Sequence, residues 1–421
     1  MTGRISLITL AVLVHALLPV ASAAPLGRTL HSAPGSISLE GIPLRIAGSL
    51  DSGPTGETLS LSLVFADGKR ARLRYAVSGE ASDLRISEAR STAPTSRQDL
   101  PPRWFLENSS SAPVDTIGGG LGIDPQGRLH YFTAGGKQQI VAEDLLPDSR
   151  IVEQERSEEE HRFVALSKPT ERYPHGVVGD RLEAEAVTIV TVRPTAGVIS
   201  EGSQPRENSA IARTIVLPTA GVIESVEAVV GEFAETEGRE ILLPVSTTAA
   251  GTRLVLLDHE GALIAEGPPI GRRFRWRHPL GGGALGPNGE RELVAVRTPH
   301  IGGVLEYYQL ESGQLKIVHS RGGYSTHRIG SRNLRTAAIL RENDGGREAV
   351  VLPTQDHRNL ALVLRTEDGS REIARRKLPG ALTSNVLSLV TKEGHAIIVA
   401  GSRNPGDNPG AVTLWMPPAN W

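Results

Sequence analysis

The chain has 421 residues, no cysteine, and a formal net charge of -2 from 45 Lys and Arg against 47 Asp and Glu. Without thiols it forms no disulfide, no cysteine–zinc site and no cysteine nucleophile, so its chemistry depends on oxygen and imidazole groups. The balanced charge argues against a dedicated nucleic-acid-binding protein, and 39% hydrophobic residues in a chain of this length suffice for a large core.

Residues 1–23 have the features of a cleaved signal peptide. Arg4 precedes an apolar run from Ile5 to Val20, and the run ends at Ala21-Ser22-Ala23. The run is shorter than the roughly 20 residues of a membrane-spanning helix, and no later stretch reaches that length. We therefore expect cleavage near Ala23 and a bacterial periplasmic or secreted protein, without a transmembrane segment and monomeric, whose large core replaces disulfides.

After the signal, short apolar runs alternate with turn dipeptides such as Asp67-Gly68 and Asn288-Gly289, which favour tight hairpins. Such runs predict β-strands, and no longer stretch has the 3.6-residue periodicity of a helix. The expected strands are 59–65, 71–77, 128–134, 185–192, 253–258, 292–298, 304–310, 348–353, 360–366, 395–401 and 411–416. The sequence thus predicts an all-β protein of antiparallel strands.

The strands recur with a period of about 50 residues. Four segments align at steps of 52, 56 and 48 residues: GREILLP (238–244), ERELVAV (290–296), GREAVVLP (346–353) and GHAIIVAG (394–401). Upstream, 183–190 lies at the right interval, and 127–132 and 67–75 fit the register less well. The period is that of a four-stranded blade, so we expect a single β-propeller of about seven blades over 24–421, clearest in 172–417. Separate sandwich domains are the alternative.

The C-terminal unit, 386–417, holds only about three strands. A ring of blades hides most strand edges only when it is closed. We therefore expect the segment SISLEGIPLRI (36–46) to supply the missing strand, so that the N-terminal and C-terminal strands pair.

The segment 329–365 carries a hydrophobic-Gly pair (Ile329-Gly330), a strand, an acidic Gly-rich loop and a strand that ends at Pro353. This layout resembles an FG-GAP/VCBS-type propeller repeat. The segments 172–180, 297–308 and 325–332 are similar to those of bacterial exported FG-GAP repeat proteins of uncharacterised function. The resemblance covers 172–400 and implies an integrin-α-like propeller with a non-enzymatic binding role, without naming a ligand.

In such repeats an acidic loop holds calcium, which takes six to eight oxygen ligands. The ligand positions here are Glu232, Ala234 and Thr236 in one loop, Ala284, Gly286 and Asn288 in the next, and Leu340, Glu342 and Asp344 in the third. None keeps three carboxylates. Weak calcium binding by Glu342 and Asp344, helped by Asn343, is the one metal site the resemblance implies, and no other cofactor is expected.

His175, His300 and His327 each precede a short hydrophobic-Gly segment. Three imidazoles on one rim could hold a transition metal. Equivalent residues of different blades lie far apart unless they point into the channel, so a hydrogen bond that fixes a turn is the expected role. Contact with a ligand is the alternative.

Arg272, Arg273, Arg275 and Arg277 surround Trp276. Guanidinium groups beside an indole suit an anionic or carbohydrate ligand. Alternation along a strand would instead place the four arginines on an outer face and Phe274 with Trp276 in the core, which is the arrangement we expect. Arg273 and Trp276, with the three histidines, are the candidate ligand-binding residues.

No catalytic motif fits its context. Gly281, Gly283 and Gly286 satisfy G-x-G-x-x-G but lead into a strand instead of a helix. Ser325 and His327 are two residues apart, which does not establish a nucleophile and base. We expect an exported, non-catalytic propeller that binds a protein or glycan through loops on one rim. An extracytoplasmic hydrolase or lyase with His, Asp and Glu at the channel mouth is the alternative.

Overall fold

The computed structural model describes residues 29–30, 36–38, 43–53, 56–66, 70–78, 85–89, 114–133, 136–193, 209–341, 347–403 and 410–418. Within these ranges every regular element is a strand, which confirms the all-β prediction. This part of the chain contains no helix with the length and apolarity to cross a membrane. The signal segment 1–23 and the acidic residues Glu342, Asn343 and Asp344 lie outside the described residues.

The strands form five hydrogen-bonded sheets. The first has the order β1 (Thr29–Leu30), β6 (Arg85–Ala89), β5 (Arg70–Ser78), β4 (Gly56–Phe65), β3 (Pro43–Gly53). The second has the order β10 (Gln138–Ala142), β9 (Leu129–Thr133), β8 (Gly119–Ile123), β7 (Val114–Thr116). Two further sheets have the orders β24 (Ala338–Arg341), β25 (Glu348–Pro353), β26 (Asn359–Thr366), β27 (Gly369–Lys377), and β2 (Ser36–Ser38), β30 (Gly410–Trp415), β29 (Ala396–Arg403), β28 (Ala381–Val390).

The remaining sheet has 13 strands and consists of three antiparallel meanders. The first two are β11 (Val152–Arg156), β12 (His161–Thr170), β13 (Glu183–Arg193), β14 (Ser209–Val216), and β16 (Val229–Gly231), β17 (Glu240–Thr247), β18 (Gly251–Leu257), β19 (Leu263–Glu266). The third is β20 (Arg277–Gly283), β21 (Glu292–Arg297), β22 (Val304–Glu311), β23 (Gln314–Gly322). The short β15 (Val222–Ile223) links β13 to β17, and one parallel pair, Glu266 with Gln314, links β19 to β23. We call each of these three meanders, and each of the four other sheets, a unit.

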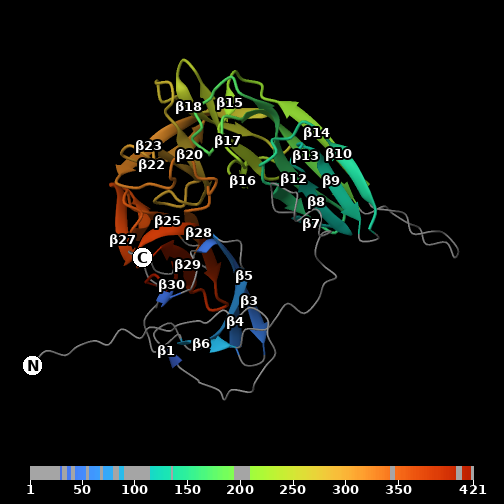
Figure 1. The fold of residues 1–421 in the computed structure, drawn as a ribbon. Coiled ribbons are helices and arrows are strands. Elements are labelled where there is room, and N and C mark those ends of the chain that lie inside the picture. Colours follow the sequence, from blue (N-terminus) through green and yellow to red (C-terminus); the bar gives the residue numbers. More distant parts are fainter. Residues whose placement is uncertain are drawn as a thin grey trace, which may run out of the picture.

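The units stand side by side along an arch (Figure 1). The first strand of each unit contacts the first strand of the next, from β11 through β16, β20 and β24 to β28 and then β3. Four-stranded antiparallel sheets with their first strands toward a common centre are the arrangement of a β-propeller.

The middle strands of a unit are buried on both faces, because a neighbouring unit covers each face. In β25, Val350 and Leu352 pack with the unit β20–β23, whereas Ala349 and Val351 pack with the unit β28–β30. All six residues of this strand are buried. Two-sided burial explains why the sequence of β25 is continuously apolar, and each valine so buried contributes of the order of 2 kcal/mol relative to exposure.

The predicted repeat matches the units. The four aligned segments are β17, β21, β25 and β29, which are the second strands of consecutive units. The upstream segments 183–190, 127–132 and 67–75 fall in β13, β9 and β5, which are third strands. The predicted alignment of the three upstream segments with the four downstream segments was therefore wrong by one strand. Second and third strands are both central, so their apolar patterns look alike.

The two ends of the chain meet in the sheet of β28–β30. Ser36, Ile37 and Ser38 of β2 pair with residues of β30, whereas the rest of the segment 36–46 leads into β3 of the first sheet. One hydrophobic core joins β3, β4 and β5 to β29 and β30. On the opposite side of the first sheet, no core cluster of described residues is shared with the β7–β10 sheet.

Candidate functional site: the loops around Trp276

Five loops meet at one end of the units. They are 171–182, 267–276, 298–303, 323–337 and 354–358. Each follows the second or the fourth strand of a unit, and in an antiparallel meander these connections lie at the same end of the strands. We call this end the loop face and the opposite end the turn face.

Trp276 is the centre of the loop face and is only 2% exposed. Its ring stacks on His278 at a centroid distance of 5.1 Å and lies parallel to His300 at 6.0 Å, and the edge of His327 approaches at 4.8 Å. Its Nε1 donates to the carbonyl oxygen of Glu224 at 2.9 Å, and its own carbonyl accepts from Thr298 N at 2.8 Å. One indole thereby connects residues from four separate segments.

The histidines around Trp276 hydrogen-bond to one another and to the loops. His327 Nε2 lies 2.7 Å from the carbonyl oxygen of Ser331, which can only accept, so Nε2 carries the hydrogen. His327 Nδ1 therefore accepts from His300 Nε2 at 2.8 Å. Burial lowers the pKa of His327 to about 3 and that of His300 to about 4, so both rings are neutral near pH 7.

His175 enters the same face from the loop 171–182. Its Nδ1 lies 2.6 Å from Glu224 Oε1, and its ring stacks on Phe274 at 5.1 Å. The Tyr173 hydroxyl accepts from Phe274 N at 2.9 Å, and Arg273 lies over the Phe274 ring at 4.2 Å. The residues that precede Trp276 are thus held by a second aromatic group.

A buried acid lies behind this group. Glu183 is fully buried, and neither carboxyl oxygen has a hydrogen-bond partner among the described residues. Burial, together with the charges of Glu224 and Asp180, raises the pKa of Glu183 to about 10. Glu183 is therefore a neutral acid at pH 7, which avoids a second buried negative charge beside Glu224.

The structure brings the three predicted histidines to one face but not to a metal site. His300 and His327 are hydrogen-bonded, and His175 pairs with Glu224. Across the part of the chain that the structure describes, no three His, Asp or Glu side chains are arranged to hold a metal ion. Each of the three histidines is hydrogen-bonded within the loop face, and contact of any of them with a ligand stays a prediction.

Sequence reasoning missed His278 and His357. His357 lies in the loop after β25, a second strand, and is the topological equivalent of His175 and His300, whereas His327 follows a fourth strand. His357 Nε2 lies 3.0 Å from Ser325 Oγ, and burial lowers its pKa to about 4. The sequence did carry a signal for His357, because a proline precedes each of the three equivalent histidines. That proline is adjacent to His175 and His300 but lies farther from His357.

The expected outer face of four arginines is wrong for Arg277. Strand β20 begins only at Arg277, and the left-handed backbone at Phe274, with φ of 53°, breaks the alternation that the prediction assumed. Arg277 is 2% exposed, and its Nε donates to Glu306 Oε2 at 2.9 Å. Arg273 is exposed and Trp276 is in the core, as expected. A ligand-binding role for either residue stays a prediction.

The outer surface of the loop face is apolar at two tips. Ile301 is 62% exposed and Ile329 is 69% exposed. Three of the six described non-glycine residues with positive φ lie in these loops: Phe274, Thr298 and His357. A β-branched residue such as Thr298 rarely adopts this conformation, and strained backbone of this kind clusters at functional sites.

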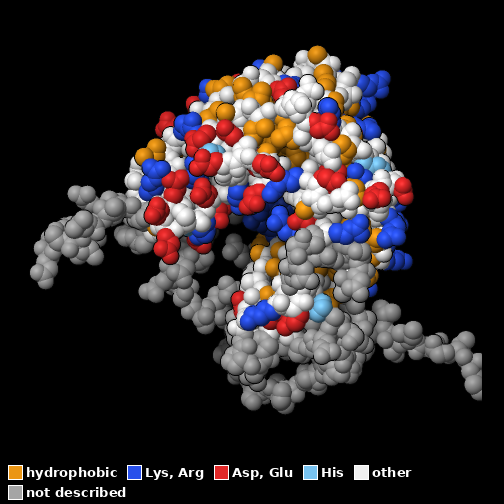
Figure 2. All heavy atoms as spheres, turned by 180° about the vertical axis from the view of Figure 1, so that it is seen from behind, with side chains coloured by type: hydrophobic (Ala, Val, Ile, Leu, Met, Phe, Trp, Pro, Cys, Tyr) orange, Lys and Arg blue, Asp and Glu red, His pale blue; other side chains and the backbone are white. Residues whose placement is uncertain are grey.

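Ion pairs tie the inner parts of the loop face together. Glu227 accepts from Arg150 Nη1 at 2.9 Å and from Arg335 Nη2 at 2.5 Å, and Arg332 pairs with Asp180 at 2.7 Å. Arg150, Glu227, Arg332 and Arg335 lie in loops that lead to the first strands β11, β16 and β24, whereas Asp180 lies in the loop before β13. Figure 2 shows Lys and Arg side chains gathered beside the central hollow, seen from behind.

Comparison with known proteins gives no family. No family model and no curated protein matches the chain. Among solved structures, it is similar to BBS1N in complex with ARL6DN, with a TM-score of 0.49 and 9% identity over 93% of this chain and 98% of that one. It is also similar to the WD40 β-propeller domain of Doa1, with a TM-score of 0.39 and 10% identity over 91% and 96%. A europium-containing methanol dehydrogenase follows, with a TM-score of 0.37 and 10% identity over 91% and 93%.

Proposed function

We propose that this protein is a non-catalytic scaffold that docks a partner protein on its loop face. The observation that carries the proposal is the pair of exposed tips, Ile301 and Ile329, on loops that a buried Trp276 holds in place. Exposed apolar side chains on a rigid support are typical of protein docking surfaces. A protein is favoured over a glycan because the aromatic rings Tyr173, Trp276 and Tyr324 are buried in this face and offer no sugar-stacking platform.

We further infer the architecture and location of the scaffold. The described strands group into seven units, with β2 as the outermost strand of the C-terminal unit, which supports a seven-bladed propeller latched by its two ends. The segment 1–23 supports export to a bacterial periplasm or medium, and the layout of 329–365 supports an FG-GAP-type repeat. The scaffold would be a monomer, because the ring buries its own strand edges.

Site-specific photocrosslinking tests the docking surface. A photoreactive amino acid replaces Ile301 or Ile329 in the exporting cell, and Leu263, which is 45% exposed next to the turn face, is the matched control. We expect a discrete adduct from positions 301 and 329 and none from 263. Adducts from all three positions, or from none, would contradict the proposal. A chelator added before irradiation reports whether calcium at Glu342 and Asp344 contributes.

One observation favours the alternative of a hydrolase. Ser325 Oγ and His357 Nε2 lie 3.0 Å apart, as a nucleophile and its base would. However, Ser325 is 1% exposed, and a base with a pKa of about 4 is too weak to activate a hydroxyl near neutral pH. We expect no labelling by a fluorophosphonate probe. Labelling that Ser325→Ala abolishes would instead support the hydrolase.

A further inference from the structure

We infer that the partner docked on the loop face presents an acidic segment that carries an apolar side chain. This inference rests on the proposed docking function and specifies the chemistry of the partner. It depends on charge segregation, on the free arginines of the loop face, and on the two isoleucine tips.

Charge is segregated between the two ends of the units β16–β27. The loops 267–276, 298–303, 323–337 and 354–358 contain seven arginines and one acidic residue, Asp356, in a chain with 45 basic and 47 acidic residues. The turns at the other end of the same units, 232–239, 258–262, 284–291 and 367–368, contain eight acidic residues and two arginines. The loop face is therefore the end to which an acidic surface is attracted.

Three of the six arginines in the loops 267–276 and 323–337 are available. Arg332 and Arg335 already pair with carboxylates, and Arg275 Nη1 donates to the carbonyl of Phe274. Arg272, Arg273 and Arg328 are exposed, and none forms an ion pair with a described Asp or Glu. Arg273 is oriented by its stacking on Phe274. A guanidinium with free edges binds carboxylate in a bidentate manner, which suits Asp and Glu side chains.

The two apolar tips lie on loops that are joined to each other. Ile301 directly follows His300, and Ile329 lies two residues after His327; the hydrogen bond between these histidines links the two loops that carry the tips. Each tip is closed by a glycine with positive φ, Gly302 and Gly330. A surface that is ordered before binding loses little conformational entropy on association. An apolar centre with arginines at its rim fits a peptide segment better than a nucleic acid, which would need exposed aromatic rings for base stacking.

The test compares two triple charge reversals. R272E/R273E/R328E removes the free arginines of the loop face, and R239E/R347E/R371E makes the same charge change at exposed arginines elsewhere. The probe is a short fluorescent Glu-rich peptide with two adjacent leucines, and its binding to the full-length protein is followed by anisotropy. We expect the loop-face variant to bind at least about tenfold more weakly, with little change in the control variant. A probe with the leucines replaced by serine should also bind about tenfold more weakly.

The outcomes separate this inference from the proposed function. No binding of the probe, or equal weakening by both triple variants, overturns the inference. Tighter binding of single-stranded RNA or of anionic vesicles than of the peptide, with the same dependence on Arg272, Arg273 and Arg328, also overturns it. If crosslinks form at 301 and 329 but are insensitive to the loop-face reversals, the docking surface stands and the acidic partner is wrong.

Discussion

The two ends of the units β16–β27 are built on the same strands but are held together differently. On the turn face, hairpins are closed by nearby residues: Asp258 Oδ1 accepts from the backbone N of Glu260 and Ala262 at 2.9 and 2.8 Å. On the loop face, Trp276 contacts His300 and His327 from two other loops. The turn face is therefore a set of hairpins that are each closed locally, whereas the loop face is one packed structure.

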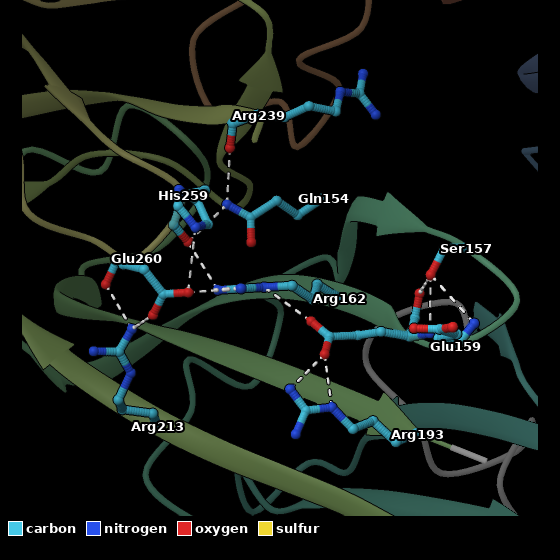
Figure 3. Close-up of polar contacts among 10 residues, drawn as sticks. Gln154, Ser157, Glu159, Arg162, Arg193, Arg213, Arg239, His259 and Glu260 are labelled. Atoms are coloured by element: carbon cyan, nitrogen blue, oxygen red, sulfur yellow. Dashed lines mark hydrogen bonds and ion pairs between the residues drawn. The ribbon is translucent and has the colours of Figure 1, made fainter. Parts of the chain in front are cut away.

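Contacts between units differ in the same way. On the turn face, Glu260 pairs with Arg162 at 2.6 Å and with Arg213 (Figure 3). Glu160 bridges Arg162 and Arg193. The Glu260 side chain is 46% exposed, and exposed ion pairs contribute little to stability. The loop face instead uses buried rings, whose removal leaves a cavity. The difference suggests that loop-face substitutions disturb several loops and turn-face substitutions only one.

Trp276→Ala should have the largest effect. Loss of a buried tryptophan lowers the free energy of unfolding by about 3–5 kcal/mol. Hydrogen exchange should accelerate in 298–303 and 323–337, which Trp276 supports, but not in the turn 258–262. Denaturant unfolding measures the free energy of unfolding, and mass spectrometry measures the hydrogen exchange. An equal acceleration at both ends would show that the loops are not held by Trp276.

Acid should destabilise the loop face through its buried histidines. The pKa of His357 is about 4 in the folded state and 6.5 in the unfolded state, so the unfolded chain binds more protons below pH 6.5. The stabilising contribution is complete above pH 6.5 and is lost as the pH falls toward 4. His357→Asn, which tolerates the left-handed φ of 57°, removes this titration. Between pH 7 and 5, the variant should lose about 2 kcal/mol less stability than the wild type. Parallel pH profiles would contradict this.

Thr298→Gly tests the strain in the loop face. Relief of the positive φ of 47° favours the variant by about 1 kcal/mol, and the greater freedom of glycine in the unfolded chain opposes it by a similar amount. We expect a net change below about 0.5 kcal/mol in urea unfolding. Thr391→Gly, at a buried turn-face threonine without positive φ, should cost more than about 1 kcal/mol. Equal costs would show that Thr298 is not strained.

Glu260→Ala should have a much smaller effect than Trp276→Ala. Hydrogen bonding to Arg162 lowers the pKa of Glu260, but the exposed carboxylate is screened by water and salt. We expect a loss below about 1 kcal/mol at low ionic strength and less at high salt, from urea unfolding at two salt concentrations. A larger loss that does not depend on salt would show that contacts on the turn face stabilise the protein as strongly as those on the loop face.

The candidate site could be predicted only in part. His175, His300 and His327 were found because each stands before a hydrophobic-Gly turn, and all three do lie on one face. Their partners could not be found, since Glu224 lies 49 residues from His175 and His300 lies 27 residues from His327. Arg277 was misplaced because alternation was continued across a residue whose backbone turns away from the strand.

The sequence by itself determined the strand content and the repeat of β17, β21, β25 and β29, because two-sided burial demands continuous apolar runs and hairpins need local turn residues. For the upstream segments, only the tertiary structure decided whether each is the second or the third strand of its unit, since second and third strands are equally buried. It also decided that Trp276 is a support and that Ile301 and Ile329 are the exposed tips. Contacts between loops depend on how the units stack, which the spacing of residues along the chain does not specify.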